Sequence, residues 1–426
     1  MSLARVLNKH YSLLRPSEQE QAGLKKECGE FLISLRKALA KTRLRTRVFV
    51  GGSFAKGTLV KKGRYDIDVF VRIKQIKESS AALEKALMMV ADSKQLVLKK
   101  IHGSRDYFQL FRHGGRVIFE IIPVLDIPRP VRAENVTDLS YFHVSYIKKR
   151  LNRRMADDVR LAKQFCHAHG VYGAESYIRG FSGYGLECLI IQYKTFANFL
   201  RGLSRAREPL VLDPAHHYRT AVEARLSLNE AKRQSPIVLV DPTYKERNVL
   251  AALSDESFQT FQKAAKKFLA RPADSFFVEK PFDLKTFTSR ARKRHFEVRR
   301  IALHTDRQAG DIAGTKLKKV ASYLLEQITP YFSIHKHRFE YAGEQCATLF
   351  VSYTPKITIE RRGPSIRMKE ACAAFKRHHA KTFVKRGRLI AHVTNAKTFE
   401  QTITELTSNH EQMYNMGLTE ARVETV

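Results

Sequence analysis

The sequence has few cysteines and no long apolar run. Its five cysteines are scattered along 426 residues and none belongs to a Cys-x-x-Cys pair, so zinc ribbons and disulfide scaffolds are not expected. The longest apolar stretches, such as 189–191 and 121–125, fall far short of the roughly 20 residues of a membrane span. The first residues lack the apolar core and cleavage site of a signal peptide. These absences predict a cytoplasmic protein with no membrane partner.

Acidic residues are scarce relative to basic ones. The chain has 42 Asp and Glu against 76 Lys and Arg, a formal net charge of +34. Such a surplus destabilises a compact monomer by self-repulsion and points to a polyanionic partner. The basic residues gather in three runs, at 148–154, 290–300 and 356–388, and no acidic block compensates them. Nucleic acid is therefore the expected partner, and charge alone does not separate RNA from DNA.

The chain contains no internal repeat and no low-complexity segment, and its apolar content suffices for several cores. Hydrophobic residues make up 43% of it, and the length favours two to four domains. The segment up to the breaker Ile127-Pro128-Arg129-Pro130 alternates helices and strands. The middle is rich in helices, and the last third mixes helices with antiparallel strands. This organisation predicts an α+β multidomain fold.

The spacing of apolar residues, together with capping and turn residues, predicts the helices and strands. A capping box at Ser17 and Glu20 begins the first predicted helix, which continues at helical spacing to Leu39. Helices are also predicted over 157–169, 186–203, 255–269, 315–328 and 368–379. Strands are predicted over 48–50, 66–73, 107–111, 117–125, 237–240, 337–341, 347–353 and 389–393. The sequence Arg361-Arg362-Gly363-Pro364 is expected to form a turn.

Two aspartates in a predicted strand carry the strongest chemical signal. Asp66 and Asp68 are two residues apart, so both side chains point to the same face, about 7 Å apart along the backbone. Two carboxylates this close resist joint ionisation unless a cation lies between them. Hard oxygen ligands of this kind suit Mg²⁺. The pair alone also occurs on exposed strand faces, so its meaning depends on what surrounds it.

The residues before this strand are suited to binding phosphate. Gly51 and Gly52 let backbone N–H groups approach a phosphate without interference from a Cβ atom. Ser53 adds a hydroxyl group and Lys56 a positive charge. A phosphate cradle followed by a metal-holding pair is typical of phosphoryl or nucleotidyl transfer.

A third carboxylate is expected from a neighbouring strand. Glu120 lies in the otherwise apolar run 117–123, where an unpaired acid would cost several kcal/mol. It therefore needs a cation or a network of hydrogen bonds. Asp126, past the end of this strand, is a weaker candidate.

The Gly51–Val71 segment resembles the nucleotidyltransferase superfamily that includes DNA polymerase beta, poly(A) polymerases and CCA-adding enzymes. Further stretches are similar to the archaeal, class I CCA-adding enzymes, which are tRNA nucleotidyltransferases. These stretches are Gly170–Glu175, Gly180–Tyr184, Val240-Asp241-Pro242, Arg247-Asn248-Val249, Ser275-Phe276-Phe277 and Arg361–Pro364. The resemblance extends from the N-terminal helix to about residue 400.

The resemblance implies an activity and a set of partners. It implies template-independent addition and repair of the 3′-terminal CCA of tRNA, with CTP and ATP as substrates. It also implies three domains: a polymerase-beta-like catalytic domain over 1–135, a central nucleotide-binding domain over 136–278, and an α+β tRNA-binding domain over 279–426. A homodimer is left open.

The resemblance also implies roles for individual residues. Asp66, Asp68 and Glu120 would hold two Mg²⁺ ions, and Glu120 would help to activate the attacking hydroxyl. The residues expected to bind the nucleotide are Gly52, Ser53, Lys56, Ser140, His143, Lys163, Tyr172 and Arg247. The basic residues expected to contact RNA are Arg292, Arg294, Arg299, Arg361, Arg362, Lys376 and Arg377.

Two other functions stay open at this point. A poly(A) polymerase-like enzyme would share the catalytic strand without measuring a tRNA-like stem. A non-catalytic RNA-binding protein on the same fold is the third possibility, although its acids would then have no evident purpose.

Overall fold

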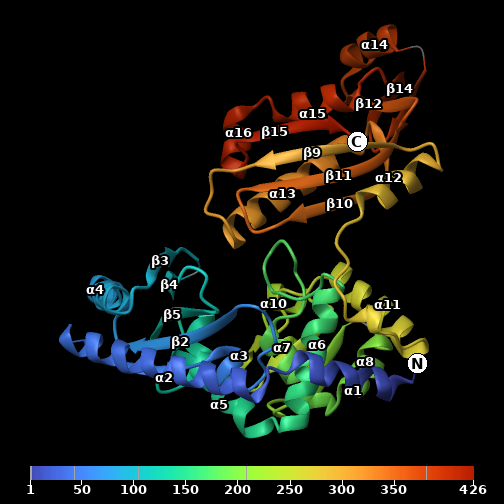
Figure 1. Cartoon of the computed structure of the whole chain (residues 1–426). Coiled ribbons are helices and arrows are strands. Elements are labelled where there is room, and N and C mark those ends of the chain that lie inside the picture. Colours follow the sequence, from blue (N-terminus) through green and yellow to red (C-terminus); the bar gives the residue numbers. More distant parts are fainter. Residues whose placement is uncertain (1, 43, 104, 208, 380) are drawn as a thin grey trace. The chain divides into compact units, whose positions relative to one another are not determined.

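The computed structural model describes residues 2–42, 44–103, 105–207, 209–379 and 381–426. The chain forms two compact units, residues 1–280 and residues 281–426, which are described separately (Figure 1). Helices and strands are mixed in both, in agreement with the predicted α+β class. The further division of the first unit at residue 135 stays a prediction.

The first unit begins with two helices and a five-stranded sheet in the order β1-β2-β5-β4-β3. Its elements are α1 (Leu3–Leu14), α2 (Glu18–Lys41), β1 (Arg47–Val50), α3 (Gly52–Ala55), β2 (Tyr65–Ile73), α4 (Ile76–Lys94), β3 (Val97–Ile101), β4 (Tyr107–Phe111) and β5 (Val117–Leu125). Strands β2 and β5 are parallel neighbours, and the other pairings are antiparallel. The parallel pair at the centre of the sheet carries the predicted acids.

Alternation in β2 and β5 separates a buried face from a polar one. Ile67 and Val69 from β2 pack with Phe119 and Ile121 from β5 in one hydrophobic core, which also contains apolar residues of α2 and α4. Because side chains alternate along a strand, the acids between these residues lie on the opposite face. The core thus fixes the register that presents the acids.

A second core joins the rest of the first unit, and α1 packs in it. The elements of this part of the first unit are α5 (Ser140–Arg150), α6 (Arg153–Ala168), α7 (Gly183–Tyr193), α8 (Phe196–Ser204), β6 (Leu210–Leu212), α9 (Ala221–Leu226), α10 (Glu230–Arg233), β7 (Ile237–Asp241), β8 (Tyr244–Asn248) and α11 (Asp255–Ala270). Short 3₁₀ turns cover Pro130–Arg132, Val136–Leu139 and Asp274–Phe276. Strands β6, β7 and β8 form a small sheet in that order.

Two helix predictions for this region were wrong in extent. The helix expected from residue 157 begins at Arg153, because the Asn152 side chain accepts a hydrogen bond from the Met155 N–H and caps the extra turn. The single helix expected over 186–203 is two helices. Lys194 has φ +70° and ends α7, and Thr195 then caps α8.

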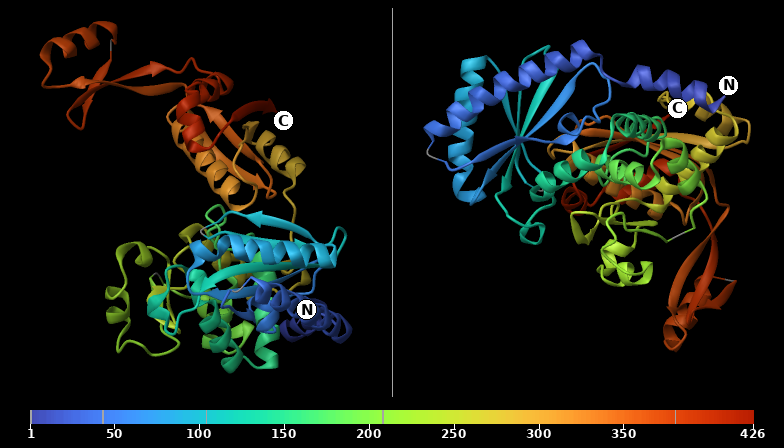
Figure 2. Two further views of the ribbon diagram at one scale, coloured as in Figure 1. Left: turned by 90° about the vertical axis from the view of Figure 1, so that its left-hand side faces the viewer. Right: turned by 90° about the horizontal axis from the view of Figure 1, so that it is seen from below.

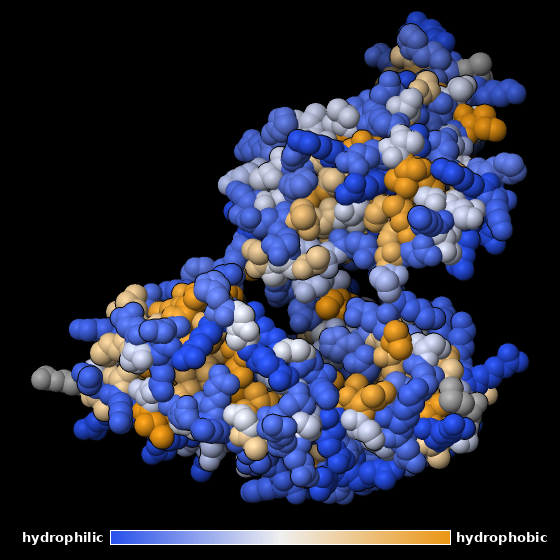
Figure 3. All heavy atoms as spheres, in the orientation of Figure 1, coloured by the Kyte–Doolittle hydropathy of each residue, from blue (hydrophilic) through white to orange (hydrophobic). Residues whose placement is uncertain are grey.

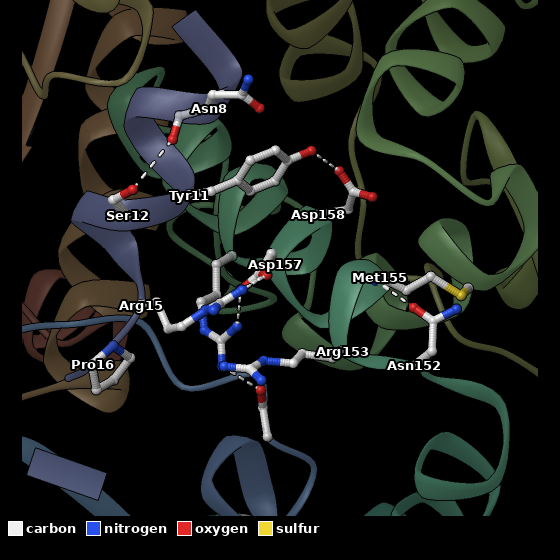
Figure 4. A network of polar contacts seen from close by, with 12 residues as sticks. Asn8, Tyr11, Ser12, Arg15, Pro16, Asn152, Arg153, Met155, Asp157 and Asp158 are labelled. Atoms are coloured by element: carbon white, nitrogen blue, oxygen red, sulfur yellow. Dashed lines mark hydrogen bonds and ion pairs between the residues drawn. The ribbon is translucent and has the colours of Figure 1, made fainter. Parts of the chain in front are cut away.

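Helix α1 is tied to α6 by buried carboxylates. The Tyr11 hydroxyl donates to Asp158 Oδ1 at 2.6 Å, and Arg15 Nε donates to Asp157 Oδ1 at 2.9 Å (Figure 4). Both aspartates are almost fully buried. The polar contacts give α1 a fixed position on α6 in addition to its apolar packing.

The centre of the second core is a cluster of phenylalanines, and its loss is the first predicted effect. Phe165 is fully buried, with its ring centroid 5.8 Å from that of Phe261 and 5.8 Å from that of Phe196. We expect Phe165→Ala to lower the free energy of unfolding by about 3–5 kcal/mol. Leu13→Ala, at a side chain that is 55% exposed, is the matched control and should change it by less than about 0.5 kcal/mol. Urea denaturation measures both, and equal effects would contradict the assigned core.

The second unit is built on a four-stranded antiparallel sheet in the order β10-β11-β9-β15, with α13, α15 and α16 contributing to its core. A three-stranded sheet, β12-β14-β13, carries α14 (Figure 2). The elements are α12 (Leu284–Arg292), β9 (Glu297–His304), α13 (Asp311–Ile328), β10 (Phe332–Tyr341), β11 (Cys346–Pro355), β12 (Thr358–Ser365), α14 (Lys369–His378), β13 (Thr382–Lys385), β14 (Arg388–Thr394), α15 (Phe399–Thr407), α16 (His410–Met416) and β15 (Glu420–Thr425).

The turn predicted at Arg361–Pro364 is wrong. These residues lie within β12, and Arg361 and Arg362 pair with Ala391 and Ile390 of β14. The register shifts between Arg362 and Ser365, so Gly363-Pro364 forms an irregularity inside the strand rather than a reversal. Across the described ranges of the chain, no helix is long and apolar enough to cross a bilayer.

Candidate active site

The three predicted acids lie together on the polar face of the first sheet. Asp68 in β2 and Glu120 in β5 are direct partners in the parallel register, and Asp66 precedes Asp68 by two residues on the same strand. The register therefore places Glu120 beside Asp68 and on the same face as both aspartates. The weaker candidate, Asp126, forms an ion pair with Arg72 at 2.7 Å instead.

The glycine loop lies directly against Asp68. The Gly51 N–H donates to the Asp68 carbonyl at 2.8 Å. Gly52 has φ +57°, and a Cβ atom there would lie 1.6 Å from Asp68 Oδ2. No side chain fits between the loop and this carboxylate. Ser53 follows in the short helix α3, which contacts α5, where Ser140 is the first residue.

Burial and mutual repulsion make two of the acids harder to ionise. Burial, with the Asp68 charge next, raises the pKa of Glu120 to about 7. Burial also raises the pKa of Asp68; Lys56 opposes this shift and Asp66 adds to it. The raised pKa values of both groups show that their ionised carboxylates are unfavourable here. A cation at this face would offset that negative charge.

The acids fit a hard divalent cation by donor type, but the side chains of Asp66 and Glu120 have other partners. Lys62 Nζ donates to Asp66 Oδ2 at 2.6 Å, and Gln109 Nε2 donates to Glu120 Oε1 at 2.8 Å. Within the part of the chain that the structure describes, no three His, Cys, Asp or Glu side chains are grouped closely enough to hold a metal ion. Binding of Mg²⁺ through both oxygens of Asp66 would require Asp66 Oδ2 to release Lys62.

The two lysines predicted to hold phosphate meet at a buried glutamate. Glu187 in α7 is 2.5 Å from Lys56 Nζ and 3.6 Å from Lys163 Nζ, and its other contact is the Thr58 hydroxyl, which donates at 2.7 Å. Burial alone would raise the pKa of Glu187, but Lys56 and Lys163 hold it below its ordinary value. Burial lowers the pKa of Lys163 to about 8. The cluster carries one net positive charge when all three groups are ionised.

His143 and Arg247 meet at a second buried acid, Asp241. His143 Nε2 is 3.0 Å from Asp241 Oδ2, and Arg247 donates to the same oxygen at 2.7 Å. The Tyr184 hydroxyl donates to Asp241 Oδ1 at 3.1 Å, and its ring stacks on His143 with centroids 3.9 Å apart. Lys56 Nζ is 5.8 Å from the centroid of the same Tyr184 ring. This contact joins the two buried clusters.

Tyr172 lies beside the lysine cluster. A Cβ atom on Gly183 would lie 3.1 Å from the Tyr172 hydroxyl and 3.9 Å from Lys163 Cε. The Tyr172 ring stacks on His167, with centroids 4.1 Å apart. All the residues predicted to bind nucleotide thus belong to the first unit. Half of them, namely Lys56, Lys163, His143 and Arg247, contact Glu187 or Asp241.

The residues predicted to contact RNA belong to the second unit. Arg292, Arg294, Arg361, Arg362, Lys376 and Arg377 are exposed, and hydrophilic residues cover most of the face of each unit shown in Figure 3. Arg299 differs from them. Its guanidinium forms ion pairs with Glu297 and Glu400, and its side chain is only 18% exposed.

Glu187 and Asp241, which we call the two buried hubs, were not predicted as site residues from the sequence. Glu187 interrupts the apolar run 186–191 just as Glu120 interrupts its strand, so the same signal could have found it. Gln109 faces Glu120 across β4 and β5, and nothing in its local sequence marks it.

The fold resembles that of a solved structure. The chain superposes on Cid1, described as having RNA terminal uridylyl transferase activity, with a TM-score of 0.51 and 14% identity, over 65% of this chain and 98% of that one. At this identity the likeness concerns the fold alone. About two thirds of the chain thus share the fold of that protein.

The relatives in sequence are more specific. The family described as tRNA nucleotidyltransferase, second domain, matches residues 157–278. The CCA-adding enzyme of Nanoarchaeum equitans is 42% identical over 50% of this chain and 52% of its own length. That of Pyrobaculum islandicum is 31% identical over 66% of this chain and 63% of its own length. The chain is similar in sequence to archaeal CCA-adding enzymes, as its motifs predicted, and its matched part spans 52% and 63% of the length of these two relatives.

Proposed function

We propose that this protein is a tRNA nucleotidyltransferase that adds C, C and A to tRNA 3′ ends from CTP and ATP. The observation that carries the proposal is the pairing of Asp68 with Glu120 across parallel strands, with Asp66 on the same face and Gly52 against Asp68. The relatives named CCA-adding enzymes support the choice of substrate. A cytoplasmic location and a homodimer stay predictions.

The acids and the lysines of the site would have different roles in the reaction. Asp66, Asp68 and Glu120 would hold two Mg²⁺ ions, which supply positive charge at the attacking ribose hydroxyl and at the departing pyrophosphate. The ammonium groups of Lys56 and Lys163 lie at one buried glutamate and would offset charge on the triphosphate. In the reaction the 3′ oxygen forms a bond to the α-phosphorus, the bond to the pyrophosphate oxygen breaks, and the hydroxyl proton is released.

The second buried hub would serve the nucleotide itself. Asp241 fixes His143 and Arg247 through one carboxylate oxygen, so the two side chains have a defined separation. We propose that Arg247 contacts the base and that His143, with Ser140 and Tyr172, contacts the sugar and phosphates. Ser53 and the Gly52 N–H complete the phosphate cradle.

Product length tests this proposal. A tRNA transcript that lacks its last three nucleotides, incubated with the protein, Mg²⁺ and all four triphosphates, should gain C, C and A and then stop. The same transcript with an intact CCA end is the control and should not be extended. Long homopolymer tails would contradict the proposal and favour the poly(A) polymerase-like alternative.

The basic second unit should make RNA binding depend on salt. The logarithm of affinity should fall with the logarithm of salt concentration, with a slope of about −0.9 per phosphate contacted on duplex and about −0.7 on single strands. Arg361→Ala should reduce the slope by about one such contact. Arg299→Ala should change it less, because Glu297 and Glu400 already neutralise Arg299. Fluorescence anisotropy measures the slopes, and a flat salt response would contradict the assignment of this surface.

A further inference from the structure

A basic pocket on the first unit lies outside the candidate active site. Its volume is about 380 Å³, and it is formed by the end of α6, one face of α11 and the segment 275–280. None of the acids, glycines or hub residues of the active site lines it. Pockets of this size accommodate small ligands or parts of larger ones.

The pocket gathers positive charge without a counter-charge. Lys263 and Lys267 lie four residues apart on α11, so their side chains share one helix face and repel each other. Lys280 contributes a third ammonium group from the opposite segment. No Asp or Glu lines the pocket, and no ion pair within the described residues involves any of the three lysines. An anion would relieve the repulsion that this arrangement creates.

The remaining walls are partly apolar and partly hydroxylated. The rings of His169 and Phe276 lie 5.9 Å apart between centroids, and His169 Nδ1 is bonded to the Phe165 carbonyl at 2.8 Å. Ser275 and Thr260 add hydroxyl groups, and Val278 is 56% exposed at the edge. A pocket that combines ammonium groups with flat rings suits a ligand that has both a phosphate and an aromatic base.

We propose that this pocket is a second phosphate-binding site, which holds one nucleotide unit with its phosphate among Lys263, Lys267 and Lys280. Lysine offers compact point charges and binds phosphate without requiring a planar partner. The shared chemistry is a nucleoside monophosphate, either free or within an RNA strand. The site goes beyond the proposed nucleotidyl transfer and does not depend on it.

Lysine reactivity on the intact chain tests the proposal. The protein is acylated at low reagent concentration with and without inorganic phosphate, AMP or a short single-stranded RNA, and each lysine is quantified by mass spectrometry. Lys266 lies on the same helix, is exposed and does not line the pocket, so it is the internal control. We expect several-fold protection of Lys263, Lys267 and Lys280 relative to Lys266.

The probes separate the two sources of the ligand. Protection by AMP means that a free nucleotide suffices, whereas protection by RNA alone assigns the site to a nucleotide of an RNA strand. If no probe protects the three lysines more than Lys266, the proposal is overturned. No triphosphate is turned over in this assay, so the proposed transferase activity could fail while this site stands.

A matched pair of variants provides the second measurement. Lys267→Ala and Lys266→Ala remove the same charge from adjacent positions of α11. Lys267→Ala should weaken binding of the protective probe several-fold and, where that probe is single-stranded RNA, reduce the salt slope by about 0.7. Lys266→Ala should do neither. Equal losses in both variants would overturn the proposal, because they would reflect general electrostatic attraction rather than a site.

Discussion

Asp68→Asn should reduce nucleotide incorporation on the order of a thousandfold. Asn keeps the size of the side chain, and so its fit against Gly52, but it removes the charge that a cation would need. Asp68 also lies directly beside Glu120 in the register, so its loss removes the central member of the three acids. Single-turnover incorporation of CTP into a truncated tRNA transcript measures the effect.

The stability of this variant separates lost chemistry from lost fold. Burial raises the pKa of Asp68, so at neutral pH the folded protein disfavours the charged carboxylate and the unfolded chain does not. A neutral Asn removes this penalty, and the Tm should not fall. Asp92→Asn, at an exposed position of α4, is the control and should retain activity. Full incorporation by Asp68→Asn would exclude Asp68 from the catalytic residues and contradict the proposed group of three acids.

The three acids could be predicted because the local sequence pattern determines on which face of a strand each side chain lies. Residues two apart on a strand share a face, so Asp66 and Asp68 needed only a correct strand prediction, and β2 extends over Tyr65–Ile73. Glu120 stood out because an acid in an apolar strand requires a partner. The register that brings it to Asp68 then follows from burying the apolar residues of both strands on one face.

Other features depend on contacts that local patterns do not contain. The helix predicted over 186–203 extends across Lys194, where the backbone adopts φ +70° and ends α7. A lysine does not predict a positive φ, which is uncommon outside glycine. Likewise, Gly363-Pro364 is a sequence typical of a turn, but the flanking residues pair with β14 and keep it inside a strand.

The buried hubs show the same limit for the site. Lys56 and Glu187 are 131 residues apart in sequence, and His143 and Asp241 are 98 apart. Spacing rules describe neighbours within one element and do not reach such pairs. The predicted phosphate-binding lysines were named without their counter-ion, although Glu187 determines where both ammonium groups lie.

Gly52→Ala should impair incorporation nearly as severely as Asp68→Asn. A Cβ atom at residue 52 would lie 1.6 Å from Oδ2 and 2.5 Å from Cγ of Asp68, far inside van der Waals contact. Either the carboxylate or the loop must move, and both are parts of the proposed phosphate and metal site. The φ of +57° adds a backbone cost of about 1–2 kcal/mol for alanine. Incorporation and urea denaturation, measured on the same preparation, give the two effects.

Gly57→Ala separates the clash from the backbone strain. Gly57 has φ +69°, but a Cβ atom there would meet nothing within 4 Å. This variant should therefore lose about 1–2 kcal/mol of stability and keep most of its incorporation rate. If Gly52→Ala were as active as Gly57→Ala, then close contact between the loop and Asp68 would not be needed for transfer. The catalytic role would then have to rest on the acids alone, without the glycine loop as part of the site.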